Sequence, residues 1–359
     1  MNKSDSERLT AFNQQEVEKH LAIITLLSIF MIMGIIGNSL IVYIHICKLN
    51  RTASTLLIIF FGWSQIFTSA ICIPMDIVFL LYSYIFTNSF LCRIMQSTIF
   101  MSAFVSGLII FTIAIDRFKR VCRPFATQFN RKDVKKLIWL NIVITTIPMT
   151  VNFYVCGIKK IPLYNNLIGH MCSMSDKANP RVVYSFFIFM LVLCVVLVLT
   201  FIIIYSTIFM KLREYSKRKR LLASLQPSIS KVSEITSSRE EHLEPTISKD
   251  SLFQPMQRRR YYIATTRITF NMFCITLSWC LTYIPYFTVT FLTTKINVRR
   301  VGWKPTEDIF YEIADHSYYI NAVIIPIIYV IFNPPFRREV ITLFKRYILC
   351  TISNKPDEN

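Results

Sequence analysis

Seven apolar runs, each long enough to cross a bilayer, dominate this chain of 359 residues. They are residues 21–47, 54–82, 91–118, 134–156, 181–212, 262–292 and 309–332. About 20 apolar residues in a helix span the hydrocarbon core of a membrane, so each run predicts one transmembrane helix. Because 53% of the residues are hydrophobic and only 17% are charged, a soluble domain is excluded. The sequence therefore predicts an all-α membrane protein, a seven-transmembrane helix bundle.

The basic residues predict the orientation of this bundle. More than two thirds of the 40 Lys and Arg residues lie in loops 48–53, 117–136 and 211–267 and in the tail from residue 333. Cytoplasmic loops are enriched in Lys and Arg, so these segments are expected inside and the N-terminus outside. We expect an extracellular segment 1–20, a membrane domain 21–332 and a cytoplasmic tail 333–359. The net charge of +19 then fits anionic membrane lipids, and nucleic acid is not an expected partner.

One long polar segment, residues 213–260, interrupts the apolar pattern. It begins and ends with basic runs at 217–220 and 258–260 and is rich in Ser and Glu between them. We expect its ends to continue the fifth and sixth helices and its middle to form a flexible third intracellular loop. Its basic runs fit either anionic lipid or a cytoplasmic protein partner, and its serines are candidate phosphorylation sites.

The tail after the last span predicts a short amphipathic cytoplasmic helix, because its apolar residues share one face. These residues are Phe336, Val340, Leu343 and Phe344. Cys350 follows them and is a candidate for palmitoylation, with a free thiol as the alternative. At the other end of the chain, Asn2 begins an Asn-Lys-Ser sequon and is a candidate glycosylation site.

Only three of the ten cysteines, Cys92, Cys156 and Cys172, are expected near the outer face, where disulfides persist. The other cysteines lie in or beside spans or on the inner side, where Cys behaves as a small apolar residue. No cysteine has metal-ligand spacing with a histidine. We therefore expect neither a metal nor a cofactor.

The third run ends in the charged triplet Asp116-Arg117-Phe118. An ionic pair at the end of a membrane helix is costly to place and is a functional-site candidate. Cys92 precedes Arg117 by 25 residues, about 37 Å of helix at about 1.5 Å per residue. These two residues are therefore predicted at opposite faces of one membrane, which suggests a helix that carries a signal across it.

In their order along the chain, these features resemble the rhodopsin-like (class A) G-protein-coupled receptors. The matching positions are Gly37-Asn38, the triplet Asp116-Arg117-Phe118, Pro124, Trp139, Tyr205, Pro285, the Pro326 to Tyr329 motif and Phe336-Arg337. The flanks of the triplet are most similar to peptide receptors, loosely of the cholecystokinin and orexin type. The resemblance implies a disulfide between Cys92 and Cys172.

The resemblance also implies a G-protein-coupling switch and a kink in the helices above it. The switch positions are Asp116, Arg117, Tyr205 and Tyr329, and the kink and toggle positions are Tyr283, Pro285 and Pro326. Tyr283 stands where relatives carry tryptophan, unless Trp279 replaces it from one turn away. An acidic partner of Arg117 on the sixth helix is replaced by Thr265, so raised basal activity is a hypothesis.

A sodium site of the family is expected to be degenerate in this chain. Its positions are Gln65, Ser106 and Asn321, and the family's carboxylate is replaced by Gln65. Ile325 also stands where relatives carry an asparagine. A hard cation needs oxygen ligands and usually a carboxylate, so we expect weak or absent sodium regulation.

The candidate ligand pocket is acidic and lacks the residue that binds monoamines. Its residues are Asp76, Gln96, Ile99, Glu312, Asp315 and His316. Ile99 stands where amine receptors carry an aspartate, so a monoamine ligand is not expected. A cationic group of a peptide could pair with these carboxylates, or the carboxylates could pair internally with Lys177 or Arg181. For His316 we favour a packed, structural role.

The resemblance implies a plasma-membrane receptor that passes an extracellular signal, in the first place a neuropeptide, to heterotrimeric G proteins. Arrestin and a receptor kinase are further expected partners, through the loop 213–260. Two alternatives stay open: a receptor for a small non-amine or lipid ligand, and a ligand-independent receptor that acts as a scaffold. A transporter is disfavoured, because the chain has only seven glycines and no internal repeat. No nucleophile or metal constellation indicates an enzyme.

Overall fold

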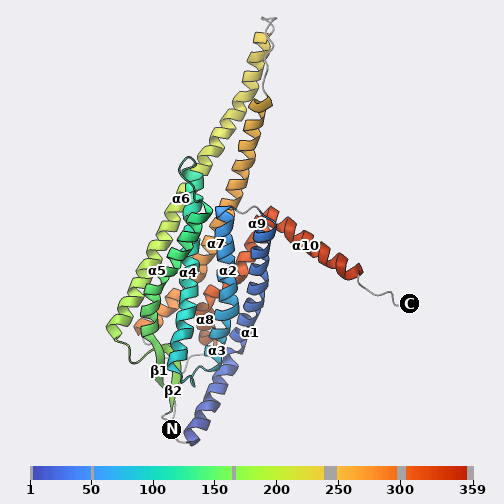
Figure 1. The fold of residues 1–359 in the computed structure, drawn as a ribbon. Helices are drawn as coiled ribbons and strands as arrows, with labels where there is room; N and C mark the ends of the chain where they lie inside the picture. Colours follow the sequence, from blue (N-terminus) through green and yellow to red (C-terminus); the bar gives the residue numbers. More distant parts are fainter. Residues whose placement is uncertain (1–2, 50–51, 164–166, 238–248, 297–304, 354–359) are drawn as a thin grey trace, which may run out of the picture.

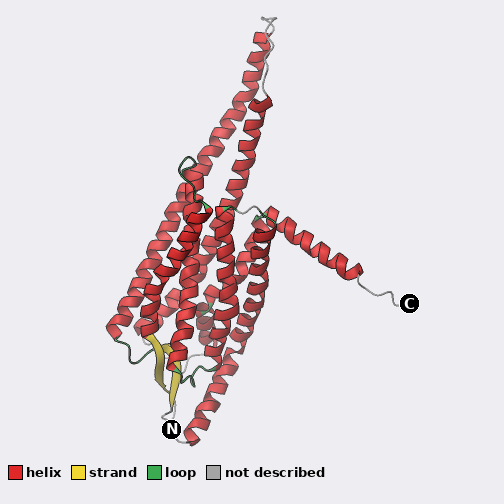
Figure 2. Ribbon diagram, viewed as in Figure 1, coloured by secondary structure: helices red, strands yellow, loops and turns green. Residues whose placement is uncertain are grey.

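The computed structural model describes residues 3–49, 52–163, 167–237, 249–296 and 305–353. It is a bundle of long helices with a small two-stranded sheet at one end (Figures 1 and 2). Within the described residues, six helices are long and apolar enough to cross a membrane, and a bent pair forms a seventh span. The predicted seven-span fold is therefore confirmed.

The helices follow one another in the predicted order. They are α1 (Lys3–Cys47), α2 (Ala53–Phe67), α3 (Ile73–Leu81), α4 (Ser89–Cys122), α5 (Arg131–Val155), α6 (Pro180–Ser237), α7 (Lys249–Ile296), α8 (Pro305–Asp315), α9 (Ile320–Phe332) and α10 (Pro334–Ser353). Strands β1 (Cys156–Pro162) and β2 (Ile168–Met174) lie between α5 and α6 and pair as an antiparallel hairpin.

The second span contains a π-helical turn between its two halves. The turn η1 (Thr68–Cys72) joins α2 to α3, and the N–H of Ile73 donates to the carbonyl of Thr68 five residues earlier. Pro74 lies in the first turn of α3, where a proline's missing N–H costs least. The backbone irregularity of this span is thus a wider turn just before Pro74.

The seventh span is bent by 51° between its outer helix α8 and its inner helix α9. The short 3₁₀ helix η3 (Ser317–Tyr319) makes the bend, and His316 precedes it. Since the break places an irregular backbone inside the bundle, polar side chains gather there. Pro326 lies lower, inside α9.

Close contact between α1 and α9 depends on a glycine. A Cβ at Gly37 would lie 2.5 Å from the Pro326 ring, well inside van der Waals contact. The neighbouring Asn38 donates from Nδ2 to the carbonyls of Gly34 and Ala322, each at 2.8 Å. The Gly-Asn pair therefore joins the first span to the last.

At the end that carries the hairpin, the first turns of α1 pack on the loop after α3. Asn13 is buried; its Nδ2 donates to the Leu81 carbonyl at 2.9 Å, and its Oδ1 accepts from the Tyr84 N–H at 3.0 Å. Leu9, Tyr84 and Leu163 form a small buried apolar cluster beside it. The segment 1–20 thus includes a docked helix, which the sequence reasoning did not anticipate.

At the opposite end, α6 and α7 run together beyond the bundle, and α10 leaves it sideways (Figure 1). Helix α6 continues to Ser237 and α7 begins at Lys249, so helical structure extends further into the 213–260 segment than predicted. The remaining residues, 238–248, lie outside the described residues, as does Asn2. Cys350 belongs to α10, the predicted amphipathic helix, but its side chain is not among those described.

Candidate functional site

A buried ion cluster stands at the end of α4 opposite the hairpin. The Asp116 carboxylate accepts hydrogen bonds from Arg117 at 2.5 Å, from Arg120 at 3.1 Å and from the Ser54 hydroxyl at 2.7 Å. Arg117 also donates to the Ser54 hydroxyl. The side chain of Asp116 is 1% exposed and that of Arg117 is 5% exposed. One anion and two cations thus meet in a nearly dry site.

A buried ion cluster of this kind is stable only while each charged group keeps its partners. A buried charge that loses its partner is strongly destabilising, whereas a satisfied one adds little net stability. Arg117 is therefore confined to its pocket beside Asp116 as long as α2 and α4 keep their present contact. The sequence predicted Asp116 and Arg117 but missed Ser54, because a serine on a neighbouring helix gives no local signal.

Tyr205 and Tyr329, the tyrosines predicted for the switch, are buried in the bundle, and among the described residues neither forms a hydrogen bond with Arg117. The Tyr205 hydroxyl is 2.9 Å from the Thr276 hydroxyl, which joins α6 to α7. Tyr329 is 1% exposed, and its hydroxyl has no hydrogen-bond partner among the described residues. Its ring packs edge-on against His45, at 5.6 Å between centroids. Tyr329 therefore has an unused hydroxyl and no polar contact that fixes its position.

The expected sodium positions form a neutral network near the middle of the bundle. Gln65 donates to the Ser106 hydroxyl at 3.4 Å, and Ser106 donates to Ser64 at 3.3 Å. Asn321 donates to Thr282 and to the Tyr318 carbonyl instead. The cavity between these groups that the centre of a water molecule can reach is about 10 Å³, room for a single water. No carboxylate lines that cavity.

Trp279 and Tyr283, the two candidates that the sequence left for the toggle position, pack against each other. Their rings lie 4.4 Å apart, both buried, one turn apart on α7. A Cβ at Gly107 would lie 2.8 Å from the Trp279 ring, so this glycine makes room for the indole. Trp279 and Tyr283, which both precede Pro285 on α7, therefore form an aromatic pair, and Trp279 packs against α4.

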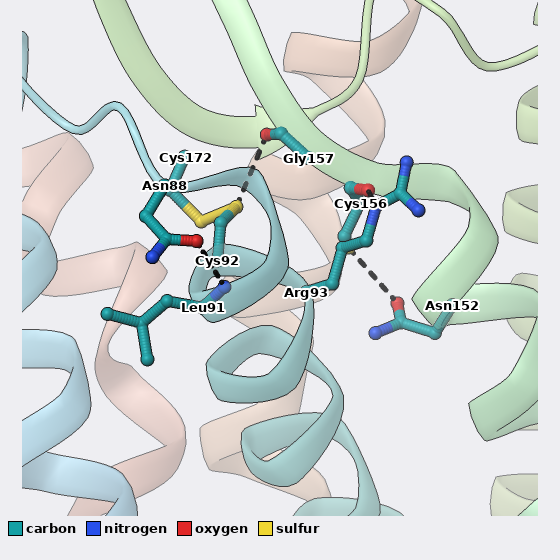
Figure 3. Close-up of a disulfide and its surroundings, with 8 residues drawn as sticks. All are labelled: Asn88, Leu91, Cys92, Arg93, Asn152, Cys156, Gly157 and Cys172. Carbon is teal, nitrogen blue, oxygen red and sulfur yellow. Dashed lines mark hydrogen bonds between the residues drawn. A yellow bond between two sulfur atoms is a disulfide. The ribbon is translucent and has the colours of Figure 1, made fainter.

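At the hairpin end, a disulfide joins Cys92 of α4 to Cys172 of β2, as expected, with Cα atoms 5.5 Å apart (Figure 3). Arg93 donates to the Cys156 carbonyl at 3.1 Å and fixes the start of β1 beside it. Cys156 is a free, buried thiol 3.7 Å from the Asn152 side chain. Burial raises the pKa of the Cys156 thiol to about 12.

Two of the candidate pocket carboxylates converge on His316 at the bend of the seventh span. His316 Nε2 lies 3.8 Å from the Asp76 carboxylate, and its Nδ1 lies 3.6 Å from the Glu312 carboxylate. Asp76 also accepts a hydrogen bond from the Tyr318 hydroxyl at 2.9 Å. Glu312 is 4% exposed and His316 7%. Asp76 and Glu312 therefore have His316 as an internal partner, which was not among the two alternatives left open by the sequence, a peptide cation or Lys177 and Arg181.

The remaining pocket candidates are Ile99, Gln96 and Asp315. Ile99 is buried and lines the same small cavity as Gln65 and Tyr283. Gln96, one turn above Ile99 on α4, and Asp315, the last residue of α8, are both half-buried. The predicted pocket is thus largely filled by its own side chains, with acidic groups above and aromatic rings beneath.

The model of the 7 transmembrane receptor (rhodopsin family) matches residues 37–329, which contain the second to sixth spans, the last part of the first span and nearly all of the seventh. The chain belongs to this receptor family. The family and fold are those of signalling receptors rather than of enzymes. The structure of squid rhodopsin superposes on the receptor with a TM-score of 0.65 at 17% identity, over 94% of this chain and 89% of that one.

Curated relatives of the receptor are distant. The RYamide receptor of Tribolium castaneum is 25% identical over 131 residues, 35% of this chain and 36% of that protein. Prostaglandin D2 receptor 2 of Mus musculus is 27% identical over 124 residues, 33% of this chain and 32% of that protein. The neuropeptide receptor npr-1 of Caenorhabditis elegans is 21% identical over 345 residues, 90% of this chain and 73% of that one. The receptor thus spans about a third of the length of the first two relatives.

Proposed function

We propose that this receptor carries an extracellular peptide signal across the plasma membrane to a heterotrimeric G protein. The observation that carries the proposal is the buried cluster of Asp116, Arg117 and Ser54 at the end of the bundle from which α6 and α7 project. A cation held by a few hydrogen bonds at the end of a helix can be released by a shift of neighbouring helices. This is the kind of two-state element that a ligand can bias from a distance.

We interpret the contacts of the two tyrosines as those of a resting state, in which Arg117 is held in its cluster rather than released. Tyr205 is bonded to Thr276, and Tyr329 packs on aromatic rings. In the proposed mechanism the inner end of α7 moves, the Tyr205–Thr276 contact opens, and both hydroxyls become available to Arg117. The unused hydroxyl of Tyr329 gains a partner in this step, which offsets part of the cost of breaking the cluster.

A peptide is the favoured ligand class. Two of the relatives are named for peptides, and the mouth of the bundle carries carboxylates that suit a cationic side chain. Such a group would have to displace His316 from Asp76 or Glu312, which would couple ligand binding to the bend of the seventh span. A small or lipid ligand, as the name of the prostaglandin relative suggests, is the alternative outcome of the same screen.

The experiment compares G-protein activation in cells by the intact receptor and by Arg117→Ala. A library of amidated peptides is applied, alongside a panel of lipid acids. We expect a peptide response that Arg117→Ala abolishes and that Arg123→Gln, an exposed cation six residues further on, retains. Identical signals from the intact receptor and Arg117→Ala would instead favour a scaffold.

A further inference from the structure

A basic groove lies at the proposed cytoplasmic end of the bundle, between the start of α2, the end of α4 and the start of α5. Its volume is about 640 Å³. Its polar lining consists of Arg120, Arg131, Lys132, Thr52, Gln128 and Asn130. None of the described residues that line it is acidic, so the groove is suited to an anion.

The three cations of the groove are not fully neutralised by the described anions around them. Arg131 and Lys132 are exposed, and within the described part of the chain neither forms an ion pair. Arg120 contacts Asp116 through Nε alone, and its side chain is 22% exposed. The terminal nitrogens of its guanidinium thus remain able to donate to a second anion, in the two-pronged geometry that suits phosphate.

The walls of the groove are held in shape without any ligand. Gln128 donates from Nε2 to the carbonyls of Arg123 and Ala126, each at 3.0 Å, which closes the loop between α4 and α5. Asn130 and Asp133 form a capping box that starts α5. Because the loop and the helix start are both fixed, binding here would lose little conformational entropy.

The surroundings of the groove point to a lipid as the source of the anion. Trp139, two turns further along α5, is 69% exposed on an apolar helix, as expected of a side chain that faces lipid. The groove therefore opens where a span enters the inner leaflet. Three cations from two helices exceed what one phosphodiester needs and match a head group with several phosphates.

We propose that this groove binds the head group of a polyphosphorylated inositol lipid of the inner leaflet. The site joins the first and second intracellular loops, and a bound head group would bridge Arg120 of α4 to the start of α5. Since Arg120 also holds Asp116, lipid binding would act on the buried ion cluster. The proposal rests on the orientation in the proposed function, but not on the identity of a ligand or G protein.

The test uses the full-length receptor in phosphatidylcholine nanodiscs, with phosphatidylinositol bisphosphate titrated in and binding read by native mass spectrometry. The variant is Arg131→Gln with Lys132→Gln. Its matched control is Lys135→Gln with Lys136→Gln, two exposed cations on the next turn that do not line the groove. We expect about a tenfold or greater loss of affinity in the groove variant and less than about a threefold loss in the control.

Three outcomes would overturn the proposal. Equal losses in the two variants, or equal affinity for phosphatidylserine at matched charge, would mean diffuse attraction to an anionic surface. Binding of soluble inositol trisphosphate as tight as that of the lipid would assign the groove to a free phosphate. Unchanged binding of the inositol lipid by the groove variant, together with a loss of G-protein nucleotide exchange in phosphatidylcholine discs that lack this lipid, would assign the groove to a G-protein contact. None of these outcomes bears on whether the receptor signals at all.

Discussion

The two ends of the receptor are held together by different means. The hairpin end, which we propose as the outer end, has a disulfide, a hairpin and an N-terminal helix that is docked by apolar contacts and by the side-chain hydrogen bonds of Asn13. The opposite end, the proposed inner end, has a cluster of side-chain charges, and α6 and α7 extend beyond it as a pair. Contacts of the first kind resist displacement, whereas charges and hydroxyls can exchange partners at small net cost. The outer end therefore suits a fixed receiving site, and the inner end suits a moving response.

The largest effect is expected from Asp116→Ala, which leaves Arg117 buried without its anion. Loss of one partner of a buried pair costs about 3–5 kcal/mol, so the melting temperature of purified receptor should fall steeply. The control is Asp133→Ala, which removes only the capping carboxylate of α5 and should cost about 1 kcal/mol. Equal losses would show that the inner cluster has no special role in holding the bundle.

The outer end should be next most sensitive, through Cys172→Ser. Opening a disulfide that closes a loop of 80 residues is expected to cost about 3 kcal/mol, with lower surface expression and lower melting temperature. Cys156→Ser is the control, since this thiol forms no disulfide. A similar loss in the control would mean that local packing, rather than the crosslink, holds this end.

Alkylation of Cys156 sharpens that comparison. Its thiol pKa is raised to about 12 by burial, so the reactive thiolate is rare at neutral pH and increases about tenfold per pH unit until pH 12. We expect negligible maleimide labelling of Cys156 in folded receptor at pH 7–8 and rapid labelling after denaturation. Labelling at the rate of an exposed cysteine in native receptor would show that the hairpin opens.

Asn13→Ala tests the docked helix at the outer end with a smaller effect. Two hydrogen bonds are lost and the buried Tyr84 N–H is left unsatisfied, which is expected to cost about 1–2 kcal/mol. Thr10→Ala, an exposed position of the same helix, is the control. If ligand affinity falls with Asn13→Ala while basal activity stays constant, the outer end is the receiving site, as the comparison requires.

Ser54→Ala should have the smallest effect on stability and the opposite effect on signalling. It removes the hydrogen bond that Ser54 donates to Asp116 and the one that it accepts from Arg117, a net cost of about 1 kcal/mol, and it loosens Arg117 without removing its ion pair. Since Thr265 gives α7 no carboxylate for Arg117, Ser54 is the restraint most easily lost, and basal nucleotide exchange should rise. Basal exchange that is unchanged would place the restraint on Arg117 elsewhere.

Much of the bundle was predictable because its signals are local. Each span is a continuous apolar run, and the triplet at residue 116 and the cysteine at 92 mark the two ends of α4. Three features were missed, namely the docking of Asn13, the contact of Ser54 with Asp116 and the convergence of Asp76 and Glu312 on His316. Each of them joins segments far apart in sequence, and none leaves a pattern in the residues nearby.

The bend of the seventh span shows what could not be predicted from the sequence. The sequence showed a proline at 326, but the 51° break lies seven to ten residues earlier, at His316 and η3. Backbone irregularity in a membrane is tolerated where polar side chains satisfy the freed groups. The Ser317 hydroxyl lies within hydrogen-bond distance of the Ala314 carbonyl at the end of α8, at 2.8 Å, and of the Thr282 carbonyl of α7, at 2.7 Å. The second partner is one that only the packed bundle supplies.

The π-helical turn at Thr68–Cys72 sets the rotational phase of the outer half of the second span. A wider turn holds one residue more than an α-helical turn, so every side chain after it is rotated by about 100° relative to a continuous helix. Asp76 reaches Tyr318 only in that rotated frame. The inner half of the span, with Ser54 and Gln65, keeps its own phase. One span can therefore present two unrelated faces to its neighbours, and a one-residue deletion within the turn would realign the outer face while leaving the inner face in register.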